Sequence, residues 1–110
     1  MLATLTAAGP SDVIQLSEGA DIQDASLMDR AIVLLGERVF ECVQRKVAPP
    51  DECFCLYPQE LSAVRKTYKA TVEKHPAWAD NVISYVREAK THAVSFSGLK
   101  RQLQKACPGD

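Results

Sequence analysis

The chain has 110 residues, a length that fits a single domain with one modest hydrophobic core. Its formal net charge of -1 at pH 7 argues against a general nucleic-acid-binding protein, because such proteins carry a strong basic excess. No apolar run is long enough to span a bilayer, so we expect no membrane span.

Residues 1–25 predict an irregular, acidic N-terminal arm, followed by a helical domain over residues 26–110. The arm has no Lys or Arg, and Gly9-Pro10 interrupts it. Its acidic residues are Asp12, Glu18, Asp21 and Asp24. Met1–Ala8 is apolar but has neither a basic start nor a full hydrophobic segment, so it does not match a signal peptide. An exported protein whose signal peptide has been removed and a cytoplasmic protein would both have an N-terminus of this kind.

Apolar residues that recur every three or four positions predict helices from Ser26, Pro58 and Pro76 and after Ser95. The four apolar stripes are Met28, Ile32, Leu35, Val39 and Cys42; Leu61, Val64, Tyr68 and Val72; Trp78, Val82, Tyr85 or Val86 and Ala89; and Phe96, Leu99, Leu103 and Ala106. Leu27, Ala31 and Leu34 widen the first stripe, which predicts a central helix. No convincing strand pair is present in the sequence. We therefore predict an all-α fold, a small four-helix bundle in which short connections make neighbours antiparallel.

Four cysteines in a short chain predict a disulfide framework in an oxidising compartment. They are Cys42, Cys53, Cys55 and Cys107. Cys53 and Cys55 are too close to bond each other without strain, and in an extended loop they point to opposite sides. One is therefore expected to bond Cys42 and the other Cys107. We favour Cys42–Cys53 with Cys55–Cys107, because Cys53 is nearer to the first helix; Cys42–Cys55 with Cys53–Cys107 is the alternative. Reduced buried cysteines and a four-thiolate metal site are further alternatives.

The sequence shows no catalytic or cofactor motif. It has no Gly-x-Ser-x-Gly, no P-loop, no dinucleotide-binding glycine pattern and no paired Cys-x2–4-Cys for zinc. His75 precedes a proline and is expected at a helix end, whereas His92 is expected in a solvated loop. We therefore expect a protein that is not an enzyme and that has neither a metal site nor a cofactor.

Two groups of residues are candidates for binding a protein partner. Three aromatic residues near the cysteine loop or at a helix start would form an anchor patch if they are exposed, namely Phe54, Tyr57 and Trp78. A basic face on the last helix would carry Lys100, Arg101 and Lys105. This face could receive an acidic partner or the acidic arm of the same chain, or it could simply be solvated.

The segment Cys55-Leu56-Tyr57-Pro58, followed by Leu61, Val64, Tyr68, His75-Pro76 and Cys107, resembles small periplasmic immunity proteins that neutralise amidase effectors of type VI secretion. The resemblance covers little more than half of the chain, and the glycine-aromatic signature expected on the first helix is absent around Cys42. It implies a helical, disulfide-stabilised protein that binds one enzyme.

These observations lead to one functional hypothesis and two alternatives. The hypothesis is a non-catalytic, secreted or periplasmic protein that binds a protein partner, for example as an immunity or inhibitor protein. The first alternative is a helical carrier that holds a small apolar ligand. The second is a thiol-dependent redox or metal-binding protein that uses Cys53 or Cys55.

Overall fold

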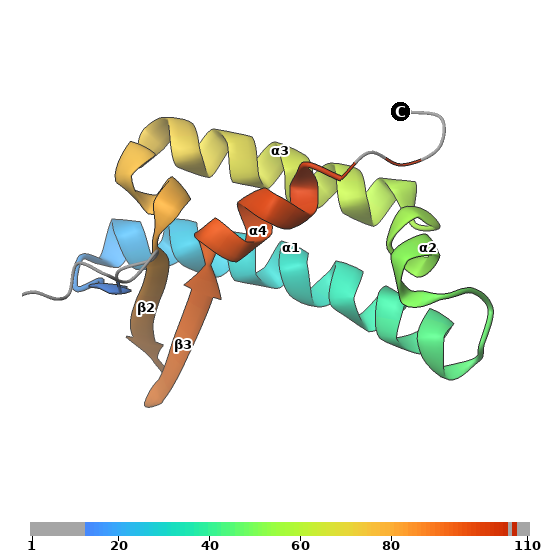
Figure 1. The fold of residues 1–110 in the computed structure, drawn as a ribbon. Helices are drawn as coiled ribbons and strands as arrows, with labels where there is room; N and C mark the ends of the chain where they lie inside the picture. Colours follow the sequence, from blue (N-terminus) through green and yellow to red (C-terminus); the bar gives the residue numbers. More distant parts are fainter. Residues whose placement is uncertain (1–12, 106, 108–110) are drawn as a thin grey trace, which may run out of the picture.

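The computed structural model describes residues 13–105 and residue 107. In chain order the elements are β1 (Val13–Gln15), α1 (Gly19–Gln44), α2 (Pro50–Cys55), α3 (Pro58–Lys74), the 3-10 helix η2 (Pro76–Asp80), β2 (Val82–Arg87), β3 (Lys90–Ser95) and α4 (Phe96–Leu103). The two long helices, α1 and α3, lie side by side, and α4 and the small sheet pack against them (Figure 1). The fold is mostly helical but belongs to the α+β class.

The prediction of an all-α four-helix bundle is wrong, because residues 82–95 form a β-hairpin. β2 pairs with β3 in antiparallel orientation and with β1 in parallel orientation, which gives the strand order β1-β2-β3. The predicted third helix is reduced to the short η2. Ile83 and Tyr85 are buried whereas Val86 is exposed. A short apolar run of this kind fits the helical period as well as the period of a strand, and here packing against the core selects the strand.

The helix α1 begins at Gly19, earlier than the predicted start at Ser26. Ala25 is fully buried and Ile22 packs against the core, so the apolar stripe extends backwards into the predicted arm. Asp21 lies in the first turn of α1, where its charge interacts favourably with the helix dipole. Val13–Gln15 forms β1, so within the predicted arm residues 13–15 are a strand and residues 19–25 belong to α1. Residues 1–12 of the predicted arm lie outside the described residues.

The core lies between α1, α3, the sheet and α4. It contains residues from each predicted stripe and from β2 and β3, including Met28, Leu35, Leu61, Val64, Trp78, Ile83, Tyr85, Val94, Phe96 and Leu99. The start of α4 is as predicted, since the hydroxyl of Ser95 caps the helix by accepting a hydrogen bond from the backbone N–H of Gly98 over 3.1 Å.

Two disulfides connect the helices at one end of the molecule. Cys42 of α1 bonds Cys53 of α2, and Cys55 of α2 bonds Cys107 beyond α4. This is the pairing that we favoured, although Cys53 and Cys55 lie in a short helix and not in an extended loop. Two residues apart on a helix, side chains differ by about 200° in direction, so they still point to opposite sides. Within the described residues, no helix is both long and apolar enough to cross a bilayer.

Candidate functional site

A hollow of ≈ 550 Å³ lies between α1, α2 and α4. Its lining residues are Val39, Pro50, Asp51, Phe54, Cys55, Gln102 and Lys105. We refer to it as the α2 hollow. Valine, proline and phenylalanine supply apolar surface to it, while Asp51 and Lys105 bring charges of opposite sign. The structure thus brings together two of the predicted partner-binding residues, Phe54 and Lys105, with the predicted disulfide residue Cys55.

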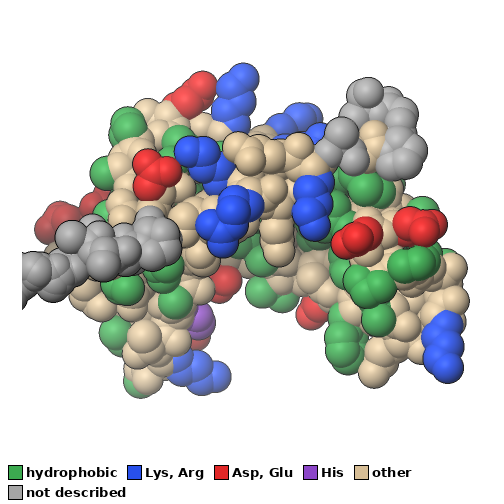
Figure 2. Space-filling view, in the orientation of Figure 1, with side chains coloured by type: hydrophobic (Ala, Val, Ile, Leu, Met, Phe, Trp, Pro, Cys, Tyr) green, Lys and Arg blue, Asp and Glu red, His purple; other side chains and the backbone are tan. Residues whose placement is uncertain are grey.

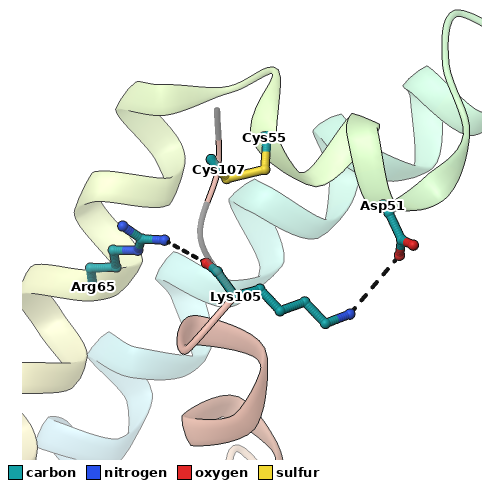
Figure 3. Close-up of a disulfide and its surroundings, with 5 residues drawn as sticks. All are labelled: Asp51, Cys55, Arg65, Lys105 and Cys107. Atoms are coloured by element: carbon teal, nitrogen blue, oxygen red, sulfur yellow. Dashed lines mark hydrogen bonds and ion pairs between the residues drawn. A yellow bond between two sulfur atoms is a disulfide. The ribbon is translucent and has the colours of Figure 1, made fainter. Parts of the chain in front are cut away.

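The Cys55–Cys107 disulfide joins α2 to the segment that follows α4, beside the α2 hollow (Figure 3). The backbone carbonyl of Lys105 accepts a hydrogen bond from Arg65 of α3 over 3.2 Å. The ammonium group of Lys105 lies 3.9 Å from a carboxylate oxygen of Asp51. Both charged side chains are strongly exposed, so this ion pair contributes little to stability. Its two charges are therefore available to another molecule.

Exposed apolar side chains continue from the α2 hollow along the end of α1 and into the turn that follows it. We call Phe40, Val43 and Val47 the apolar shoulder; Phe40 is 63% exposed and Val47 62%. Val43 lies one helical turn beyond Val39, which lines the hollow, so the two surfaces are contiguous. Figure 2 shows hydrophobic side chains exposed at the α2 end of the molecule, with acidic side chains beside them. Grouped exposed apolar residues of this kind are typical of interaction surfaces.

The three predicted aromatic anchors do not form one exposed patch. Trp78 is only 5% exposed, and its ring stacks on that of His75 with centroids 3.9 Å apart. Phe54 and Tyr57 are half-buried and pack against the core. Of the three, Phe54 alone lines the α2 hollow. The sequence did not single out the apolar shoulder, because the helical period of α1 does not say which of its apolar residues will remain uncovered.

The predicted basic residues of α4 are all exposed, and Lys and Arg side chains gather over α4 and the adjacent α3 (Figure 2). Lys100 lies 3.3 Å from Asp80, and Lys105 approaches Asp51, so two of the three charges have acidic neighbours. Arg101 is exposed between them in sequence. The basic face is thus present but partly neutralised. Its contact with the N-terminal arm stays a prediction, because residues 1–12 lie outside the described residues.

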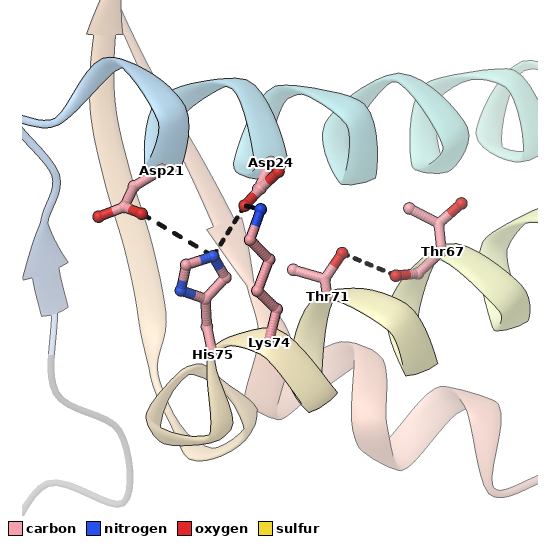
Figure 4. A network of polar contacts seen from close by, with 6 residues as sticks. All are labelled: Asp21, Asp24, Thr67, Thr71, Lys74 and His75. Carbon is pink, nitrogen blue, oxygen red and sulfur yellow. Dashed lines mark hydrogen bonds and ion pairs between the residues drawn. The ribbon is translucent and has the colours of Figure 1, made fainter.

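A polar cluster joins the end of α3 to the start of α1 (Figure 4). The Nε2 atom of His75 lies 2.8 Å from an Asp24 carboxylate oxygen, and the Lys74 ammonium lies 3.0 Å from the same oxygen. Asp21 is 3.9 Å from His75. His75 also ends α3, as predicted, with its backbone N–H donating to the carbonyl of Thr71. Asp21, Asp24 and His75 converge closely enough to hold a metal ion. However, Lys74 already neutralises Asp24, so the contacts are those of an ion-pair link between helices.

His92 is not in a solvated loop, as the sequence suggested. It lies in β3, half-buried, where its ring stacks on Tyr85 with centroids 5.0 Å apart. Its Nδ1 atom is 3.9 Å from Asp29 of α1. His92 therefore helps to attach the hairpin to α1. All four cysteines are bonded in disulfides, so none offers a thiol for redox exchange or metal binding unless a bond is first reduced.

Comparison of the chain with protein-family models, curated proteins and solved structures gives no match.

Acid is expected to destabilise the protein through Asp24. The hydrogen bond with His75 holds the pKa of the Asp24 carboxyl below its ordinary value of 3.8, with help from Lys74, although burial opposes the shift. A carboxyl with a lowered folded-state pKa stabilises the fold above its unfolded pKa and loses this effect as pH falls through the folded pKa. Denaturant midpoints should therefore drop more steeply for the wild type than for Asp24→Asn between about pH 5 and about pH 2. Parallel pH profiles would contradict this assignment.

Proposed function

We propose that this chain is a non-catalytic protein that binds a protein partner through the α2 hollow and the apolar shoulder. The observation that carries the proposal is a hollow with an apolar lining and opposite charges, which continues through Val39 to the exposed Phe40 and Val43 of α1. Covering an exposed phenylalanine or valine side chain is favourable by about 1.5–3 kcal/mol. The shoulder would therefore supply affinity, while Asp51 and Lys105 would set the orientation of the partner.

The disulfides support this proposal because they fix the elements that form the site. Cys42–Cys53 holds α2 against α1, and Cys55–Cys107 holds the end of the α4 segment against α2. A site fixed before binding loses less conformational entropy when a partner docks. Two disulfides also fit an oxidising compartment, so the proposal includes a secreted or periplasmic location. The resemblance to immunity proteins favours an enzyme as the partner, which the protein would inhibit.

Partner capture by single-residue variants tests the proposal. Immobilised wild-type protein with intact disulfides is exposed to the secreted or periplasmic fraction of its source, and captured proteins are quantified by mass spectrometry. We expect Phe40→Lys to reduce capture of the specific partner at least tenfold, since a charge replaces an apolar contact at the shoulder. Lys105→Glu is expected to reduce it less, because its ion pair is exposed.

The matched control is Val86→Lys, which places the same charge at an exposed valine of β2, away from the site. It should leave capture unchanged. Equal capture by the wild type and by Phe40→Lys, with circular dichroism showing that both proteins are folded, would overturn the assignment of the apolar shoulder as a binding surface.

A further inference from the structure

The two disulfides differ in how well the protein shields them from other molecules. Cys42 and Cys53 are only 1% and 0% exposed, so the bond between them lies inside the protein. Cys55 is partly buried and lines the α2 hollow, whereas its partner Cys107 is 9% exposed. A thiol in solution can therefore reach the Cys55–Cys107 bond from the hollow, at the sulfur of Cys55, while the fold protects Cys42–Cys53.

The Cys55–Cys107 bond is also the strongest link between α2 and the segment that follows α4. α4 ends at Leu103, and Lys105 of this segment makes two polar contacts, one with Arg65 and one with Asp51. Both contacts lie at the surface, where water competes for the same groups, so each holds the segment weakly. The covalent bond therefore determines whether Lys105 stays at the α2 hollow (Figure 3).

Loss of this bond would leave the rest of the fold in place. α1 lies against α2, α3 and β3, so it is central as predicted, although Leu27 and Leu34 remain about half exposed. These contacts join elements that lie outside the segment after α4. The other disulfide still holds α2 to α1. Release of the segment is thus a local opening and does not require the protein to unfold.

We propose that the Cys55–Cys107 bond is a redox-sensitive switch that controls the α2 hollow, and that a dithiol reductant opens it. Lys105 lines the hollow and supplies the positive charge beside Asp51, so release of its segment removes one side of the binding site. The oxidised protein then binds its partner, and the reduced protein binds it weakly. This inference rests on the proposed function, because it concerns the regulation of the same site.

The reaction is a thiol–disulfide exchange in two steps. A thiolate of the reductant attacks the sulfur of Cys55, the bond to Cys107 breaks, and Cys107 leaves as a thiolate that takes up a proton. The second thiolate of the reductant then attacks the reductant sulfur of the mixed disulfide, and Cys55 leaves as a thiolate. Two electrons pass to the protein, and the reductant ends with an internal disulfide. The reverse exchange, with an oxidised dithiol, closes the switch.

The order in which the two bonds are reduced tests the inference without any partner. Native protein is treated with dithiothreitol, alkylated at intervals and digested, and each cysteine is quantified by mass spectrometry. Cys55 and Cys107 should be labelled at least about tenfold faster than Cys42 and Cys53, while the circular dichroism spectrum stays that of the folded protein. In guanidinium, which removes the protection by the fold, the difference should disappear. Equal rates in the native protein, or faster labelling of Cys42 and Cys53, would overturn the inference.

Hydrogen exchange of the selectively reduced and alkylated protein tests whether the segment is released. Backbone amides in residues 101–105 should exchange faster than in the oxidised protein, whereas those of α1 and α3 should be unchanged. If residues 101–105 exchange at the same rate in both forms, the segment stays in place and the switch is wrong.

Partner capture separates failure of the switch from failure of the proposed function. The double variant Cys55→Ser with Cys107→Ser should capture the partner at least about tenfold less than the wild type, because the segment carrying Lys105 is no longer held at the site. If Phe40→Lys lowers capture but the double variant does not, the switch is wrong and the binding site stands. If neither lowers capture, the binding site is wrong, and its regulation is wrong with it.

Discussion

Replacing Cys55 and Cys107 together with alanine is expected to lower the free energy of unfolding by about 4 kcal/mol. The bond joins residues 52 positions apart, and in the chain-entropy model a cross-link over a long loop mainly removes freedom from the unfolded chain. The shorter Cys42–Cys53 link, over 11 positions, gives about 3 kcal/mol in the same model. Domains of this size have only about 5–15 kcal/mol of net stability, so either loss would be large.

Guanidinium denaturation followed by circular dichroism measures this loss. The same curve for wild-type protein under reducing conditions, in which both bonds are broken, serves as the lower reference. A double variant that loses less than about 1 kcal/mol would contradict the role assigned to the Cys55–Cys107 bond.

Replacing Phe96 with alanine is expected to destabilise the protein by about 3–5 kcal/mol. Phe96 is fully buried at the junction of β3 and α4. Its ring lies 5.6 Å from that of Trp78 and 6.1 Å from that of Tyr68, measured between centroids. The side chain therefore fills the space where α4, η2 and α3 meet, and its loss leaves a cavity that a rigid core cannot close.

Phe96→Leu is the matched variant, because it keeps most of the buried apolar area. It should lose much less stability than Phe96→Ala in the same denaturation experiment. Equal losses for the two variants would show that the aromatic contacts, and not the volume of the side chain, determine the stability at this position.

The sequence predicted the parts of the fold that have strong local signals. The apolar helical stripe that follows Ser95 predicted the position of α4, and Pro58 predicted the start of α3. The spacing of Cys53 and Cys55 predicted that each bonds one of the two distant cysteines, for a reason that holds in a helix as well as in a loop. The nearness of Cys53 to the first helix then favoured the pairing that the structure has.

The hairpin could not be predicted from such local signals. Its turn places Glu88 and Ala89 at φ 54° and 65°, a conformation that hairpins usually give to Asn or Gly. With neither residue present, the sequence carried no turn signal, and Val82 to Val86 matched a helical stripe. β1 spans only Val13–Gln15, and its parallel partner β2 lies far along the chain, so that pairing has no local signal at all.

The candidate site was predicted only in part. Phe54 and Lys105 were identified because an aromatic residue in a cysteine-rich segment and a basic residue on a polar face are visible in the sequence. Trp78 looked equally available, but His75 and Phe96 cover its ring. Phe40 was missed because its exposure depends on where α2 and α4 stop covering α1, which is a property of the tertiary structure.

Hydrogen exchange of the free protein and of its complex with the captured partner tests the central claim most directly. If the partner binds at the α2 hollow and the apolar shoulder, backbone amides in residues 39–55 and 101–105 will exchange more slowly in the complex. Those of β2 and β3 will be unchanged. Slowed exchange confined to the hairpin, with no change at Phe40 or in α2, would contradict the proposed binding site.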